Sequence, residues 1–239
     1  MVLLHGFAGS GASWDAVRTA AGGEAYPALA PDLPACGIEG CVRFVLDAAP
    51  PSFELAGYSL GARVALHVAL AAPERVRRLV LVAGTAGLES EEERSARRAA
   101  ADALAARLEG GGVEAFAAFW SAQPLFADDP PAVRAAQEAE VRSRDASTLA
   151  AMLRALSPGV VPAVWSRLGE LGGVPVDVIA GSRDLKYVAL GRRLVTQLPD
   201  ARLHVVPGAG HGLLREAPAA VAAVLTQASG SRAPGPPGR

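Results

Sequence analysis

The sequence has little that points to metal or redox chemistry. Only two of its 239 residues are cysteines, and the spacing of Cys36 and Cys41 is neither Cys-x-x-Cys nor accompanied by a second pair of ligands. Two ordinary reduced thiols fit this pattern better than a redox or metal pair. The four histidines are scattered, no cluster has the spacing of metal ligands, and no phosphate-binding loop occurs. We therefore expect neither a metal nor an organic cofactor.

Long apolar runs and tracts of a single charge are lacking as well. No apolar stretch approaches the ~18 residues of a membrane-spanning helix, and residues 1–5 are too short and too uncharged for a signal peptide. The 23 basic and 24 acidic residues are spread along the chain and give a net charge of −1. This composition argues against nucleic-acid or membrane partners and favours a cytoplasmic protein. No sequence feature fixes the oligomeric state, and we expect a monomer.

Apolar runs that are typical of strands alternate with helical patterns. The strand-like runs are 2–4, 53–57, 78–83, 176–180 and 202–206, with a weaker extended piece at 25–30, and the helical patterns between them are 59–72, 190–198 and 218–227. With 51% hydrophobic residues, the chain can bury a substantial core. This alternation predicts an α/β fold with a mostly parallel, doubly wound sheet.

One long segment interrupts the alternation. Residues 88–171 contain no strand-like run, and helical patterns follow one another at 91–108, 113–120, 131–144 and 147–155. We interpret 88–171 as a helical cap over the carboxyl edge of the sheet, where ligands bind in open α/β folds. The predicted core is then 1–87 together with 172–229, and the Pro/Gly-rich residues 230–239 are predicted to be a disordered tail.

The segment Gly57-Tyr-Ser-Leu-Gly61 fits the pattern G-x-S-x-G, follows a strand-like run and opens a helical one. In this context the pattern is typical of the nucleophile elbow of the α/β-hydrolase fold, in which a serine stands on a sharp turn between flanking small residues. A simple N-cap serine is the alternative, but it leaves the two glycines unexplained. We predict that Ser59 carries the chemistry.

A serine at its ordinary pKa needs a histidine to take its proton. His211 lies in a Gly-rich loop after the last strand-like run, in the chain order that this fold uses. His67 lies inside a helix and His204 inside a strand, where packing or structural roles are expected. His5 begins the Gly-rich loop after the first run, and we expect it to bond neighbouring backbone. His211 is therefore the predicted base.

The third member should be an acid placed between the serine and the histidine in the chain. Asp184 follows the run 176–180 directly, so it should share a sheet edge with Ser59 and His211 and fix the tautomer of the histidine. Asp177 is the rival, but it lies within the strand and should point away from that edge.

The segment His5-Gly-Phe7 matches the oxyanion loop that follows an early strand in this fold. The backbone N–H groups of Phe7 and Leu60 are the predicted oxyanion donors.

Motifs over nearly the whole chain, up to about Leu225, go beyond a generic hydrolase. They are Leu4-His-Gly-Phe-Ala-Gly9 with Trp14, Gly57-Tyr-Ser-Leu-Gly-Ala-Arg63, 87–97, Phe119-Trp120, Gln123-Pro-Leu-Phe126, 148–153, Gly181-Ser-Arg-Asp-Leu-Lys186 and Gly208-Ala-Gly-His211. On these residues the chain resembles the MenH family, the menaquinone-pathway enzymes that make 2-succinyl-6-hydroxy-2,4-cyclohexadiene-1-carboxylate (SHCHC) with release of pyruvate.

The resemblance implies that Ser59, activated by His211, abstracts a proton from the substrate ring, and that a 2,5-elimination expels pyruvate. The substrate is a small molecule with several carboxylates, which guanidinium groups suit. The family's substrate-binding positions fall on Arg63, Arg97, Arg142, Trp120 and Tyr58.

Several of these assignments have rivals. Arg98 and Arg144 lie close to two of the arginines, Trp120 could be core packing, and any cap arginine could belong to a solvated helix face.

Two departures from the family are visible. Family members usually carry one or two leading strands, whereas here the His-Gly motif starts at position 5, so we expect those edge strands to be missing, as in a truncated gene start. Ala62 stands where glycine is common, a change that should not disturb the elbow.

The main competing function is a serine hydrolase that acts on carboxylic esters or carbon–carbon bonds with the same three residues. The arginine set argues against it. A haloalkane dehalogenase or epoxide hydrolase would need an aspartate in place of Ser59, and a non-catalytic receptor would not need all three residues.

Overall fold

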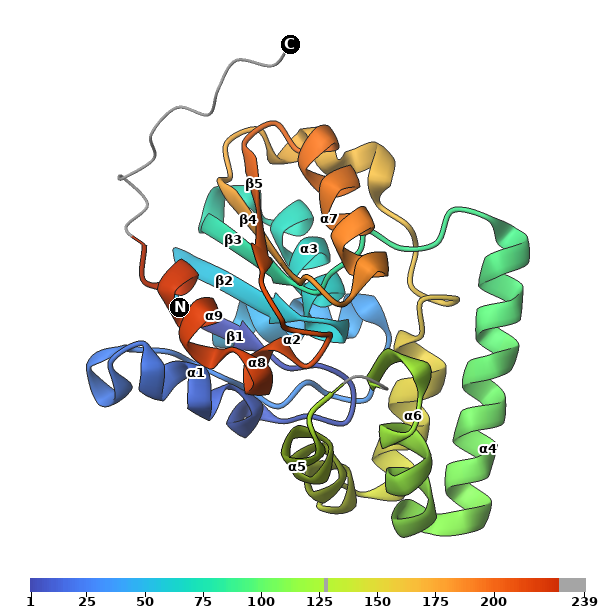
Figure 1. Ribbon diagram of the computed structural model, residues 1–239. Helices are drawn as coiled ribbons and strands as arrows, with labels where there is room; N and C mark the ends of the chain where they lie inside the picture. The colour runs from blue at the N-terminus through green and yellow to red at the C-terminus, as the bar shows by residue number, and fades with distance from the viewer. Residues whose placement is uncertain (127–128, 228–239) are drawn as a thin grey trace.

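A computed structural model describes residues 1–126 and 129–227, so the predicted disordered tail 230–239 lies outside the described residues. Within them, five strands form one sheet in the order β1-β2-β3-β4-β5, and every neighbouring pair is parallel. The strands are β1 (Val2–Leu4), β2 (Phe53–Tyr58), β3 (Val76–Val82), β4 (Val176–Gly181) and β5 (Ala201–Val206). The predicted parallel sheet is confirmed, and its carboxyl ends share one edge (Figure 1).

Helices cover both faces of this sheet. One face packs against α2 (Ile38–Ala48), α3 (Leu60–Ala71) and α7 (Leu185–Gln197), and the other against α1 (Asp15–Ala20), α8 (Leu213–Glu216) and α9 (Pro218–Leu225). Side chains alternate between the faces: Leu79 and Leu81 join the cluster around α3, whereas Val80 and Val82 join the opposite one. The fold is therefore doubly wound, as the alternation of elements predicts.

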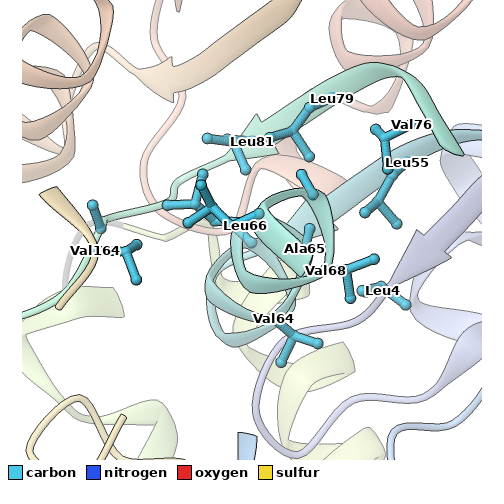
Figure 2. Close-up of a cluster of buried hydrophobic side chains, with 14 of the residues drawn as sticks. Leu4, Leu55, Val64, Ala65, Leu66, Val68, Val76, Leu79, Leu81 and Val164 are labelled. Atoms are coloured by element: carbon cyan, nitrogen blue, oxygen red, sulfur yellow. The ribbon is translucent and has the colours of Figure 1, made fainter. Parts of the chain in front are cut away.

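Helix α3 lies at the centre of the larger core cluster. Figure 2 shows Leu66 and Val68 of this helix among side chains of the strands, including Leu4, Leu55 and Leu79. Ten of its twelve residues are buried, as expected of a helix that is apolar on all sides. Truncating one such leucine to alanine typically costs about 2–5 kcal/mol, so the start of α3 is held firmly in place.

Most of the inserted segment 88–171, called the cap from here on, lies beyond the carboxyl ends of the strands, whereas its last element, η5 (Trp165–Leu171), packs against α3 and α7 in the core (Figure 1). The cap contains α4 (Glu91–Ser121), η4 (Pro124–Phe126), α5 (Pro131–Arg142), α6 (Ala146–Leu156) and η5 (Trp165–Leu171), and no strand in its described part. Gly112 interrupts α4 with a φ of 74°, between the two helices that the sequence predicts there. The division into core and cap stays a prediction.

Some local elements differ from those predicted. The weak extended piece at 25–30 is no strand: it holds the end of η2 (Gly23–Ala25) and a single bridge between Val2 and Leu29. Helices α1 and α2, and the short turns η1 (Gly11–Trp14) and η3 (Pro73–Arg75), were not predicted. The signal for α2 is present, because Ile38, Cys41, Val42 and Val45 follow the i, i+3, i+4, i+7 spacing of an amphipathic helix.

Cys36 and Cys41 are free thiols with their Sγ atoms 3.7 Å apart. No helix in residues 1–126 or 129–227 combines the length and apolar character needed to cross a membrane.

Candidate active site

Ser59 stands alone between the end of β2 and the start of α3, in a strained backbone conformation. Its φ of 53° and ψ of −106° lie in a region that residues other than glycine rarely adopt. The two flanking glycines are required by close approach of the chain. A Cβ on Gly57 would lie 2.2 Å from the Gly61 carbonyl oxygen, and one on Gly61 would lie 2.2 Å from that of Leu4. The elbow therefore needs both glycines.

The structure brings Ser59, His211 and Asp184 into one chain of hydrogen bonds. The His211 Nε2 lies 3.1 Å from the Ser59 Oγ, and the His211 Nδ1 lies 2.8 Å from the Asp184 Oδ2. All three residues follow the carboxyl ends of strands, β2, β5 and β4 respectively. With the Asp184 carboxylate accepting a hydrogen bond from Nδ1–H, the unprotonated Nε2 is free to take the Ser59 proton.

Buried aromatic rings fix the position of His211, which is 2% exposed. The Tyr58 hydroxyl donates to the His211 carbonyl oxygen at 3.1 Å, and the rings of Tyr187 and Phe126 lie 4.6 and 6.0 Å from the imidazole. Burial raises the pKa of Tyr58, which keeps its hydroxyl protonated as a donor. Sequence reasoning missed Tyr187; its signal is its place three residues after Asp184, whose Oδ1 accepts the Tyr187 N–H at 3.2 Å.

The predicted oxyanion donors, Phe7 and Leu60, both line the cavity above Ser59. Neither backbone amide donates to another described residue. His5 holds this loop: its Nδ1 donates to the Gly6 carbonyl oxygen at 2.8 Å, and its Nε2 accepts the Leu33 N–H at 2.8 Å. Burial lowers the pKa of His5, so the ring is neutral and suited to this structural role.

The other residues weighed from the sequence have structural partners. Asp177 lies inside the sheet, where Arg78 and His204 donate to it at 2.7 and 2.8 Å. Although burial acts to raise it, hydrogen bonds from His204 and Arg78 hold the pKa of Asp177 below its usual value. His67 bonds the Pro162 backbone.

A cavity of about 320 Å³ opens above Ser59, between the edge of the sheet and the cap. Its walls combine apolar and polar side chains, and Trp120 contributes to them through an aromatic cluster with Phe7 and Phe126. The charged groups that line it are Arg63, Arg97, Glu140, Lys186 and Arg215. Such a pocket suits a small polar molecule with negative charge.

Arg63 is the most unusual of these charges because it is buried without an acidic partner among the described residues. Its residue is 8% exposed, one guanidinium nitrogen donates to the Leu156 carbonyl oxygen at 2.9 Å, and its Nε has no partner in the described part of the chain. Burial lowers its pKa to about 10, and nearby Arg97 acts in the same direction. Such a charge is costly unless an anion joins it.

The structure also separates the predicted arginines from their rivals. Arg97 faces the cavity, whereas Arg98 pairs with Glu91 at 2.5 Å and with the Gly159 carbonyl oxygen at 2.9 Å. Arg97 therefore lines the cavity and its rival Arg98 does not, and substrate binding by Arg97 stays a prediction.

The structure does not place Arg142, the third predicted substrate-binding arginine, among the residues that line the cavity. Arg142 pairs with Glu114 at 2.9 Å and Glu138 at 2.7 Å, away from the cavity lining. The reason is the phase of α5: Gln137, Glu140 and Val141 face the cavity, and Arg142 is rotated about 100° from Val141. The rival Arg144 pairs with Asp32 instead, at 3.1 Å.

Sequence reasoning missed three charged residues of the cavity. Arg215 pairs with Glu140, which also accepts the Ser13 hydroxyl at 2.5 Å. Lys186 follows Asp184 by two residues, and Arg215 follows His211 by four. Their closeness in sequence to Asp184 and His211 was the available signal. Residues 1–126 and 129–227 contain no group of three or more metal-ligating side chains.

Comparison with known proteins agrees with this geometry. Residues 1–224 match the alpha/beta hydrolase family. The 2-succinyl-6-hydroxy-2,4-cyclohexadiene-1-carboxylate synthase of Klebsiella pneumoniae is 34% identical over 240 residues, which cover 95% of this chain and 92% of that protein. A putative synthase of the same name from Bacillus subtilis is 37% identical over 171 residues, which cover 69% of this chain and 61% of that protein, less than two thirds of its length.

Solved structures agree with the similarity to these relatives. MenH from S. aureus superposes with a TM-score of 0.86 at 25% identity, covering 94% of this chain and 90% of that one. A thermophilic esterase from Thermogutta terrifontis, at 21% identity and a TM-score of 0.74, shares the fold. The chain therefore belongs to the alpha/beta hydrolase family and, within it, to the MenH family of 2-succinyl-6-hydroxy-2,4-cyclohexadiene-1-carboxylate synthases.

Proposed function

We propose that this enzyme eliminates pyruvate from 2-succinyl-5-enolpyruvyl-6-hydroxy-3-cyclohexene-1-carboxylate (SEPHCHC) to give SHCHC, a step of menaquinone biosynthesis. The observation that carries the proposal is Arg63, a buried cation beside the cavity above Ser59 that has no acidic partner in residues 1–126 and 129–227, with Arg97 nearby. The named relatives support it.

The chemical structures of the substrate SEPHCHC and the product SHCHC define the bonds that the reaction must change. The hydrogen on ring carbon 2 is acidified by the adjacent succinyl keto group. Its removal gives an enolate; the double bonds then move to carbons 2–3 and 4–5 as the bond from carbon 5 to oxygen breaks. The departing enolpyruvate takes up a proton and becomes pyruvate. The reaction therefore needs a base for one proton and a site for an oxyanion.

In the proposed mechanism, His211 takes the Ser59 proton through Nε2, and the Ser59 oxygen removes the ring proton. Asp184 holds the tautomer of His211 and stabilises the imidazolium. The backbone amides of Phe7 and Leu60 receive the enolate oxygen. A positioned base of this kind contributes about 10²–10⁴-fold to the rate.

The substrate carboxylates are proposed to bind Arg63 and Arg97, whose guanidinium groups form strong bidentate bonds with carboxylates. Trp120 and Tyr58 form the apolar walls, and Lys186 adds a further cation. A neutral ester would leave the charge of Arg63 without compensation, so the lyase is favoured over the ester hydrolase.

The test follows pyruvate release from SEPHCHC generated in situ, with an aryl ester assayed in parallel. Wild type should release pyruvate and cleave little ester, Ser59→Ala should lose the activity, and Ser143→Ala, at an exposed hydroxyl outside the cavity, should keep it. Ester cleavage without pyruvate release above background would show that the enzyme is a hydrolase and not a lyase.

A further inference from the structure

A buried pair of carboxyl groups lies against the loop that carries His211, and the proposed mechanism uses neither of them. Asp129, between η4 and α5 in the cap, is 5% exposed, and the side chain of Glu216, at the end of α8, is 4% exposed. Glu216 lies close enough to Asp129 to act on its ionisation. A methyl group on Gly210 would lie 3.1 Å from a carboxyl oxygen of each, so both groups contact the residue that precedes His211.

Glu216 connects the two loops that hold the partners of Ser59. Both of its oxygens accept the Gly210 N–H, each at 3.0 Å, and Arg183 donates to the same carboxylate. Gly210 immediately precedes His211, and Arg183 immediately precedes Asp184. One buried carboxylate therefore fixes the loop after β4 relative to the loop after β5.

Asp129 adds a connection from the cap. Its Oδ2 has no partner in the described part of the chain and lies 3.0 Å from the Cβ position of Gly212, on the other side of His211. Burial, followed by the charge and hydrogen bond of Glu216, raises the pKa of Asp129 to about 7, while Arg183 and Arg134 act to lower it. Tyr58 also lies within reach of the Asp129 charge. Two carboxyl groups this close do not readily ionise together.

We propose that Glu216 is a positioning residue that holds His211 in line with Ser59 and Asp184, and that the proton shared by Glu216 and Asp129 locks the cap onto this loop. The inference rests on the proposed role of His211 as base. When the proton is lost, two negative charges face each other beside Gly210, the cap detaches from the loop, and the alignment of His211 with Ser59 loosens.

The first measurement is the rate at which a fluorophosphonate, a reagent for activated serines, modifies Ser59 from about pH 5 to pH 9. This reagent makes the result independent of the natural substrate. Wild type should give a bell-shaped profile that falls above about pH 7, as Asp129 loses its proton. In Asp129→Asn the rate should still rise with pH on the acid side of the profile but should not fall above about pH 7, because the amide donates to Glu216 at every pH.

Glu216→Gln should be modified about ten- to a hundredfold more slowly at every pH, since a displacement of ~1 Å can cost about 10² in rate. Glu170→Gln, which removes an exposed carboxylate paired with Arg167, is the matched control and should behave as wild type. If Glu216→Gln fails to fold, the pH profile of Asp129→Asn carries the test.

The second measurement is amide hydrogen exchange of the peptide 207–214, corrected for the intrinsic pH dependence of exchange. Protection should fall above about pH 7 in wild type, persist in Asp129→Asn and be reduced in Glu216→Gln. If this exchange pattern is found but the reagent does not modify Ser59, the positioning role of Glu216 is supported. Only the proposed function is then contradicted. A wild-type profile in Asp129→Asn, or unchanged modification and exchange in Glu216→Gln, overturns the inference.

Discussion

Replacing Arg63 with methionine should impair the enzyme without destabilising the protein. The lowering of the Arg63 pKa from 12.5 to about 10 corresponds to about 3 kcal/mol against the charged form. At pH 7 the group is charged in both the folded and unfolded states, so this cost is present in full. Methionine keeps much of the side-chain volume and loses one hydrogen bond from a charged donor, to Leu156, worth about 1.5–3 kcal/mol. We expect the free energy of unfolding to be unchanged or higher by up to about 1.5 kcal/mol, and the Tm to be higher by about 0–6 °C.

The same substitution should lower kcat/KM for SEPHCHC about ten- to a hundredfold, because a hydrogen bond to a charged group is worth about 1.5–3 kcal/mol. Differential scanning fluorimetry and the pyruvate assay measure the two effects on one preparation. Arg142→Met is the control: its ion pairs are exposed and outside the cavity, so both quantities should stay close to wild type. A lower Tm with unchanged kcat/KM would show that Arg63 is a structural cation and refute the reasoning.

Three further predictions follow from the described contacts. Asp184→Asn should lower the rate of pyruvate release about 10⁴-fold with little change in Tm, since it removes the tautomer control of the base; activity within tenfold of wild type would contradict this. Gly61→Ala should lower the free energy of unfolding, measured in urea, by about 3 kcal/mol or more, because its Cβ would lie 2.2 Å from the Leu4 carbonyl oxygen. Gly111→Ala is the control: its Cβ would contact only a side chain, at 3.8 Å, so the free energy of unfolding should stay close to wild type. The free energy of unfolding should fall as pH rises from about 4 to 7, because folded Asp129 keeps a proton that the unfolded chain releases, and Asp129→Asn should flatten this dependence.

Much of the fold could be predicted because the relevant signals are local. Buried strands show as continuous apolar runs, and the elbow glycines record backbone contacts at 2.2 Å that a side chain would block. The order of Ser59, Asp184 and His211 along the chain sufficed to predict that their side chains lie together, since each follows a parallel strand and the carboxyl ends of such strands meet.

The cap shows where this reasoning stops. Whether an arginine of a helix faces the cavity depends on helix phase and on neighbouring acids, and a shift of one residue turns a side chain by about 100°. Arg142 is drawn outward by Glu114 and Glu138, contacts 28 and 4 residues away in the chain. The Glu140–Arg215 pair joins residues 75 positions apart, and no local pattern reports such a contact.

The central claim is that Ser59 and His211 act as a base in an elimination, not as a nucleophile. The most direct test is single-turnover pyruvate release from SEPHCHC carrying deuterium at ring carbon 2, with intact-mass analysis of the enzyme during turnover. We predict a primary isotope effect on release and no covalent adduct on Ser59. An adduct on Ser59, together with no isotope effect, would contradict the account and indicate covalent hydrolase chemistry.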